Sequence, residues 1–214
     1  MAHKVHPKSY RLKDLNDWDS RWLNNKKLAQ NLEEDFKIRE IVKKKTGKMA
    51  VAKIEIERFA GKINLIISSA RPGLIIGRGG EGIESLKREL EKKVFKVSPK
   101  KDLKLEIKEI KDPWSSAALA GQWIAGQIER RMPHRRVIKQ TMEKLMASRS
   151  NKGARIEMTG RLGGTEIARR EWLQKGNMPR QTIRADIDFA EERAFCTYGT
   201  IGIKVWIYKG EKFD

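Results

Sequence analysis

A glycine-rich stretch in the first half of the chain has the composition of a phosphate-contacting loop. Gly77, Gly79 and Gly80 surround Arg78, and from Glu81 onward apolar residues recur at helical spacing. Glycine lets a backbone turn tightly and approach another chain without a Cβ in the way. The amide groups at the start of the following helix can receive phosphate oxygens, and Arg78 adds a positive charge. The stretch therefore predicts a loop that holds the backbone of a nucleic acid.

The same glycines also match a dinucleotide-binding pattern. Gly77, Gly79 and Gly82 satisfy G-x-G-x-x-G, and Asp102 follows where that pattern expects an acidic residue. A dinucleotide turn leaves its strand directly, however, and Pro72-Gly73 separates these glycines from the preceding strand pattern. We therefore favour the nucleic-acid loop. A nucleotide-dependent oxidoreductase and a plain turn between two helices are the alternative interpretations.

A second cluster of positive charge lies in the second half of the chain. Arg135, Arg136 and Lys139 fall within an arc of about 100° on a helix that Pro133 is expected to begin. The apolar side of that helix, centred on Ile138, points elsewhere, so the three cations share an exposed side. Like charges this close cost stability unless a polyanion offsets them, which favours phosphate binding over a merely solvated helix face.

A third glycine-rich segment is compatible with two interpretations. Gly160-Arg161-Leu162-Gly163-Gly164 places three glycines around an arginine. A hairpin turn and a backbone contact to RNA explain this segment equally well.

The composition favours a polyanionic partner and excludes several classes of protein. The 214 residues include 47 Lys or Arg and 28 Asp or Glu, which leaves a net charge of +19. The single cysteine, Cys196, excludes an internal disulfide and a multi-cysteine zinc site. The start of the chain lacks a secretory signal, and the longest uncharged stretch, Pro113 to Ile128, is too short to cross a membrane. We expect a soluble, cytoplasmic protein without a catalytic site, a metal site or a cofactor.

The spacing of apolar residues predicts two α+β units after a polar extension. Residues 1–20 are expected to order only against a partner. Residues 21–111 predict the order helix, strand, strand, glycine loop, helix, strand. Residues 112–214 predict two helices packed on a mainly antiparallel sheet, the first helix beginning at Asp112-Pro113. A strand face in this unit is expected to include Ile183 and Phe189.

Seven short segments, in this order, carry a resemblance to a known family. The segments are Lys4-Val5-His6-Pro7, Trp18-x-Ser20-x-Trp22, Ala70-Arg71-Pro72-Gly73, Ile76-Gly77-Arg78-Gly79-Gly80, Gly160-Arg161-Leu162-Gly163-Gly164, Ile183-Arg184-Ala185-Asp186-Ile187-Asp188 and Thr197-Tyr198-Gly199-x-Ile201-Gly202-x-Lys204-Val205-Trp206. The fourth resembles the signature of the K-homology (KH) domain, whose loop clamps about four nucleotides. Over essentially the whole chain, the sequence resembles the universal third protein of the small ribosomal subunit in its bacterial-type form.

The resemblance implies a fold and a set of partners. The fold is an N-terminal type II KH domain followed by a C-terminal α+β domain, in a structural protein of the subunit head. The implied partners are ribosomal RNA, mRNA at the channel through which it enters, and the neighbouring small-subunit proteins ten and fourteen. By position, the cations of that channel match Arg135, Arg136 and Lys139. Dispersed cations are further candidate contacts to ribosomal RNA: Lys4, Arg11, Arg131, Arg161 and Arg169. A free KH factor of RNA processing or ribosome assembly is the alternative.

Overall fold

The computed structural model describes residues 5–11, 17–23, 27–47, 50–59, 62–93 and 102–212. They group into two compact units, which are described separately below. One unit is Trp18–Lys111, and the other joins Met1–Asp17 to Asp112–Asp214.

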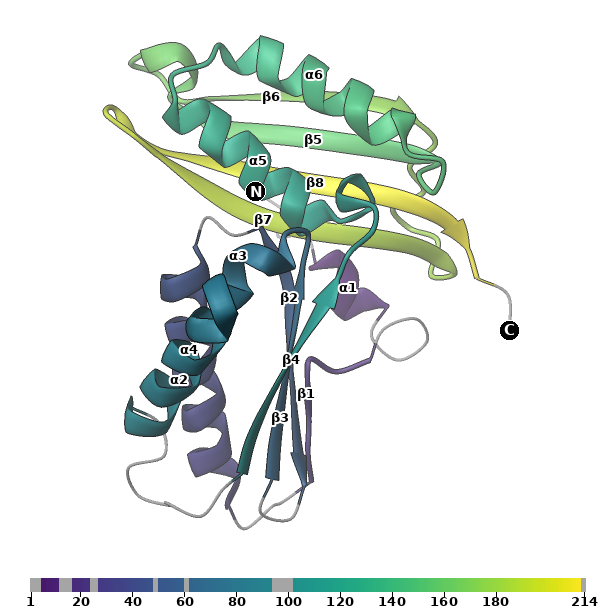
Figure 1. The fold of residues 1–214 in the computed structure, drawn as a ribbon. Coiled ribbons are helices and arrows are strands. Elements are labelled where there is room, and N and C mark those ends of the chain that lie inside the picture. The colour runs from purple at the N-terminus through teal and green to yellow at the C-terminus, as the bar shows by residue number, and fades with distance from the viewer. Residues whose placement is uncertain are drawn as a thin grey trace. The chain divides into compact units, whose positions relative to one another are not determined.

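The first unit contains one four-stranded sheet with helices on one face (Figure 1). Its elements are β1 (Ser20–Arg21), α2 (Leu28–Thr46), β2 (Val51–Phe59), β3 (Lys62–Ser69), α3 (Pro72–Ile76), α4 (Glu81–Lys93) and β4 (Asp102–Glu109). The strands lie in the order β1-β2-β3-β4. Strands β2 and β3 pair antiparallel, whereas β1 pairs parallel with β2 and β4 pairs parallel with β3. The predicted order of elements is confirmed, with β1 and α3 as additions.

The core of this unit follows from two patterns of apolar residues, the alternation along the strands and the helical spacing along α2 and α4. Ile54 and Ile56 face one side of β2, because alternate residues of a strand point to opposite faces. Ile38 of α2 and Leu86 and Leu90 of α4 pack against that side, and all of these side chains are buried. This packing anchors α4, and Ile75 of α3 belongs to the same core.

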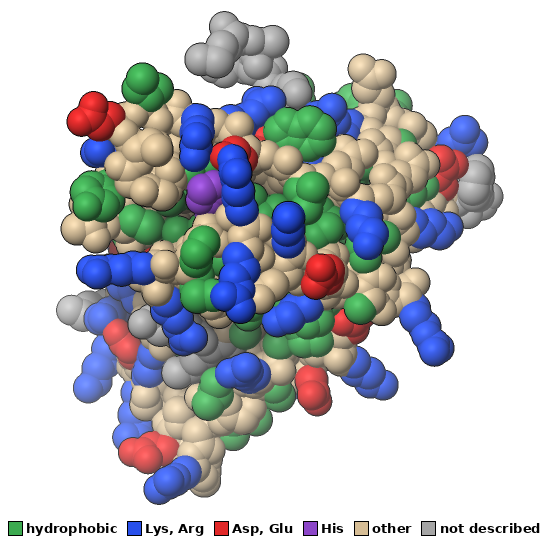
Figure 2. Space-filling view, turned by 90° about the horizontal axis from the view of Figure 1, so that it is seen from above, with side chains coloured by type: hydrophobic (Ala, Val, Ile, Leu, Met, Phe, Trp, Pro, Cys, Tyr) green, Lys and Arg blue, Asp and Glu red, His purple; other side chains and the backbone are tan. Residues whose placement is uncertain are grey.

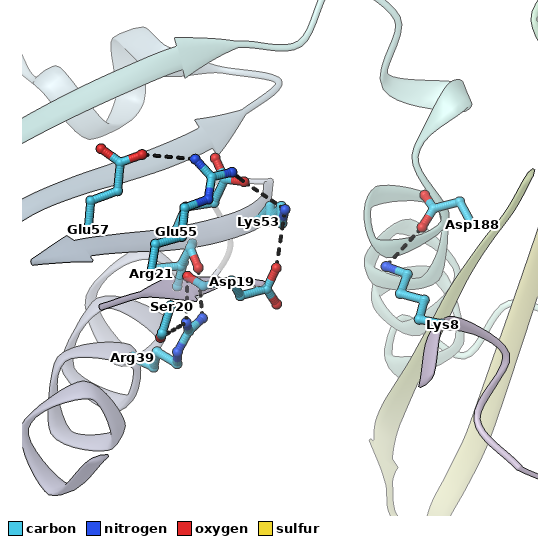
Figure 3. A network of polar contacts seen from close by, with 10 residues as sticks. Lys8, Asp19, Ser20, Arg21, Arg39, Lys53, Glu55, Glu57 and Asp188 are labelled. Atoms are coloured by element: carbon cyan, nitrogen blue, oxygen red, sulfur yellow. Dashed lines mark hydrogen bonds and ion pairs between the residues drawn. The ribbon is translucent and has the colours of Figure 1, made fainter. Parts of the chain in front are cut away.

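The short strand β1 is fixed by a polar network that the sequence does not reveal (Figure 3). The Arg39 guanidinium donates to the carbonyl of Ile54 at 2.7 Å and to Ser20 Oγ at 2.8 Å. Lys53 Nζ lies 3.2 Å from Asp19 Oδ1. Helix α2 therefore ties the chain before it to the edge of the sheet.

The second unit contains an antiparallel sheet with two helices on one face (Figure 1). Its main elements are α5 (Ala117–Glu129), α6 (His134–Ala147), β5 (Gly153–Gly160), β6 (Arg169–Gly176), β7 (Ala185–Cys196) and β8 (Gly199–Glu211). The strand order is β6-β5-β8-β7, and each neighbouring pair is antiparallel. The predicted α+β arrangement is confirmed, whereas β6 was not predicted.

The start of α5 differs from the prediction. The Asp112 carboxylate accepts a hydrogen bond from the amide of Trp114 at 3.1 Å, as an N-cap should, but it caps the separate 3-10 turn Pro113–Ser115. Helix α5 begins later, at Ala117, whose amide donates to Asp188 Oδ2 at 2.8 Å. A strand residue thus caps the helix. Ile183 also differs, because it precedes β7 and is half exposed.

Residues 5–11 of the N-terminal segment pack on the second unit, which differs from the expectation that residues 1–20 order only against a partner. Helix α1 (Pro7–Tyr10) contacts β7. The His6 ring meets Phe189 edge-on, with 4.8 Å between ring centroids. Lys8 Nζ lies 2.9 Å from Asp188 Oδ1 (Figure 3).

Candidate nucleic-acid interface

The glycine loop between α3 and α4 adopts backbone angles that favour glycine. The φ angles of Gly77, Gly79 and Gly80 are 72°, 60° and 85°, values that other residues seldom adopt. Gly77, Arg78 and Gly79 are exposed. The loop therefore presents bare backbone and one cation to solvent, as a phosphate-contacting loop requires.

Gly82 has a role in this loop that the sequence did not suggest. A Cβ atom on Gly82 would lie 2.4 Å from the carbonyl oxygen of Ile75 and 2.8 Å from that of Ile76. The first turn of α4 therefore touches the backbone of α3, which sets the width of the loop. Strand β3 ends at Ser69, and α3 separates it from Gly77. A dinucleotide turn must leave its strand directly, so the dinucleotide interpretation is wrong.

The start of α4 limits where an anion can bind. Glu81 and Glu84 occupy its first turn, where their carboxylates stabilise the positive end of the helix dipole. Their negative charge opposes a phosphate at the start of the helix. The loop backbone and Arg78 are therefore the groups best suited to a sugar-phosphate chain.

The basic residues of α6 lie on its exposed side, opposite a buried one. Arg135, Arg136 and Lys139 are exposed, whereas Val137 and Ile138 are buried in the core of the unit. Packing of that apolar side fixes the direction in which the cations project. Among the described residues, no carboxylate forms an ion pair with Arg136 or Lys139 within 4.0 Å.

Arg135 has a carboxylate partner that the sequence analysis missed. Its Nε and Nη2 atoms lie 3.3 Å from Oε2 and Oε1 of Glu171, which belongs to β6. His134 Nε2 lies 3.1 Å from the same carboxylate. The hydrogen bond from Arg135 lowers the pKa of Glu171, against the opposing effect of burial. Because β6 was not predicted, nothing in the sequence places Glu171 beside α6.

The dispersed cations differ in their surroundings. Arg131 follows α5 and is exposed, and its φ angle of 63° is unusual for a residue with a side chain. Arg169 Nε lies 3.5 Å from Glu171 Oε1. Arg161 donates from Nε to the carbonyl of Thr165 at 2.9 Å and lies over the Tyr198 ring. The segment around Arg161 joins β5 to β6 as a hairpin connection. Lys4 lies outside the described residues.

Arg11 does not fit the expected contact with RNA, because its side chain is buried. Only 1% of its surface is exposed. Its Nη2 atom donates to the carbonyls of Thr182 at 2.8 Å and Arg180 at 3.0 Å, and Nη1 donates to that of Pro7 at 3.2 Å. Burial lowers the pKa of Arg11. Within the chain, Arg11 ties the N-terminal segment to the connection before β7.

The described residues lack a candidate metal site and a membrane-spanning helix. No group of three or more His, Cys, Asp or Glu side chains among them could hold a metal ion. No helix in that part of the chain is long and apolar enough to span a membrane. On the face drawn in Figure 2, Lys and Arg side chains are more widely spread than Asp and Glu.

Comparisons with known proteins agree with this division into units. Residues 37–115 match the family model of the KH domain, and residues 124–207 match that of the ribosomal protein S3 C-terminal domain. The small ribosomal subunit protein uS3 of Caldicellulosiruptor saccharolyticus is 47% identical over 212 residues, covering 99% of this chain and 93% of that protein. The namesake from Clostridium botulinum is 48% identical with the same coverage. That of Endomicrobium trichonymphae is 46% identical over 213 residues, covering 100% of this chain and 90% of the relative. With identity this high over almost its whole length, the chain belongs to the family of the small ribosomal subunit protein uS3.

Proposed function

We propose that this chain is a structural, non-enzymatic constituent of the small ribosomal subunit, that it binds ribosomal RNA, and that α6 guides mRNA where it enters. Membership of the uS3 family supports the ribosomal role. The resemblance noted above adds the neighbouring small-subunit proteins ten and fourteen as partners.

The basic side of α6 is the observation that carries the mRNA proposal. Arg136 and Lys139 project from a helix whose other side is buried, so their charges are held in place without a bound partner. Glu171 holds the Arg135 guanidinium at two atoms. Such a surface attracts any phosphate backbone and reads no bases, which suits an RNA that must slide past it.

The glycine loop supplies a second contact, to ribosomal RNA. Its exposed backbone admits a sugar-phosphate chain closely, and Arg78 adds a charge. Arg131, Arg161 and Arg169 are the described dispersed cations that remain candidates for the same RNA.

A charge-matched pair of variants tests the role of α6. Changing Arg136 and Lys139 to Gln should reduce the slope of log K against log salt, for single-stranded RNA, by about 0.7 per lost phosphate contact. Arg135 is left unchanged, so that the contact with Glu171 persists. The control changes Lys87 and Lys92, two exposed cations of α4, to Gln, which removes the same charge. An equal effect of both pairs, or none from either, would exclude a dedicated surface on α6.

A further inference from the structure

The sheet of the second unit has a face that α5 and α6 do not cover. The helices pack on the side of Ile156, Ile203 and Val205. Strand register places the other side chains in rows across the sheet, because paired residues of antiparallel strands point to the same face. One row is Arg193, Gly202, Thr159 and Arg170, and the next is Glu191, Lys204, Glu157 and Trp172.

Only part of this face is open. Beyond the second row, Ile187 and Tyr208 are buried with Met178 in a small separate core, and His6 covers Phe189. The first row keeps Arg193, Thr159 and Arg170 exposed. The open part is therefore a defined surface, bounded on one side by the N-terminal segment.

Trp172 is the large aromatic residue of the two rows, and it is already held in place. Its side chain is 52% exposed, although tryptophan is usually more buried. The guanidinium of Arg155 lies 4.1 Å from its ring centroid, and Arg155 is itself 5% exposed. Glu157 at 3.2 Å and Gln174 at 3.3 Å fix that guanidinium. One face of the indole thus rests on Arg155, and the other is free to stack.

The charges around Trp172 favour a polyanion. Thr159 and Gly202, which has no side chain, form a low area of this face. Around it lie the side chains of Arg170, Arg193 and Lys204. Glu157 is largely buried and lies 3.2 Å from Arg155 and 3.6 Å from Arg170, and Glu191 is paired with Lys204 at 3.1 Å. The two rows hold three cations, Arg170, Arg193 and Lys204, and two carboxylates.

We propose that this open face is a binding site for single-stranded RNA, in which a base stacks on Trp172 while Arg170, Arg193 and Lys204 contact phosphates. An aromatic platform among cations on a sheet is a common solution for single strands, whose bases are free to leave their own stack. The site is separate from the glycine loop and from α6. It shares with the proposed function only that the partner is RNA.

A tryptophan substitution tests the stacking. The starting chain carries Gly79→Asp, Arg136→Gln and Lys139→Gln, which weaken the other two contacts. In this chain Trp172→Leu should weaken binding of a short mixed-sequence RNA by about 5- to 150-fold, the loss of one stacked base. An abasic strand of equal length and charge should bind the chains with and without Trp172→Leu equally tightly. The Trp172→Phe chain should retain most of the affinity for the RNA. Phe36→Leu, at an exposed aromatic residue of α2 in the other unit, is the control.

Three outcomes would overturn the proposal. The first is that Trp172→Leu leaves the RNA affinity unchanged. The second is that Trp172→Leu weakens binding of the abasic strand as much as binding of the RNA. The third is that the Trp172→Leu chain still binds RNA but no longer binds a protein partner. If Trp172→Leu unfolds the chain, Arg193→Gln is tested in its place. This change should reduce the slope of log K against log salt for RNA binding by about 0.7, and an unchanged slope would contradict the proposal. Failure of the α6 proposal is measured separately, in a chain that keeps Trp172.

Discussion

Buried and exposed arginines contribute differently to the charge of this molecule. The side chains of Arg11, Arg58 and Arg155 are almost fully removed from water. Arg11 donates hydrogen bonds to three backbone carbonyls, and Arg58 forms ion pairs with two carboxylates. Arg155 lies over the indole ring of Trp172. Such groups build the fold, because removing a partner would leave a buried charge uncompensated. An RNA partner therefore meets the exposed cations and not the whole formal charge.

The contact between Glu171 and Arg135 should make the free energy of unfolding depend on pH. Because the folded-state pKa of Glu171 is lowered, its contribution to stability is complete above about pH 4.5 and is lost as pH falls through the folded-state pKa, which is lower still. Glu171→Gln should therefore have a smaller free energy of unfolding than the native chain at pH 7, and this difference should vanish in strong acid. Urea unfolding across this pH range measures it. Glu143→Gln, an exposed residue of α6, is the control, and an equal pH dependence in both variants would contradict the assignment.

At the scale of elements, the crossing of α3 and α4 decides the shape of the glycine loop. Gly82→Ala should destabilise the first unit by about 1–3 kcal/mol, because its methyl group would overlap backbone that cannot easily move. The change should weaken RNA binding as well, since the loop widens. Thermal unfolding with an RNA titration measures both effects.

Gly73→Ala provides the control for this prediction. It lies on α3, and nothing stands within 4 Å of the place its Cβ would take. Comparable stability of the Gly73→Ala and Gly82→Ala chains would show that the helices can separate without cost.

Sequence periodicity predicted those elements that bury one regular face. Helix α4 and strand β8 have such faces and were expected. Strand β6 was missed, because Trp172 and Leu173 are adjacent and the other residues are polar, so no alternation marks it. The start of α5 was misplaced because its capping group, Asp188, is distant in sequence. The basic side of α6 was predicted from local spacing alone, whereas its partner Glu171 depends on the pairing of β6 with β5.

For the whole molecule, charge connects the fold with the proposed role. The net charge of +19 would make a compact chain repel itself in the absence of a polyanion. The proposed places for one are the glycine loop in the first unit and the basic side of α6 in the second. Neither place requires chemistry beyond charge and an accessible backbone. We therefore propose that this chain serves to bind RNA in a particle and not to catalyse a reaction.

Sedimentation of the native chain from cell extract tests that claim most directly. The chain should migrate with the small ribosomal subunit, remain there through a high-salt wash, and be released when the RNA is digested with ribonuclease. Release by salt alone would instead indicate a free KH factor of RNA processing or assembly. Migration as a lone 24.7 kDa protein, unaffected by ribonuclease, would contradict the account altogether.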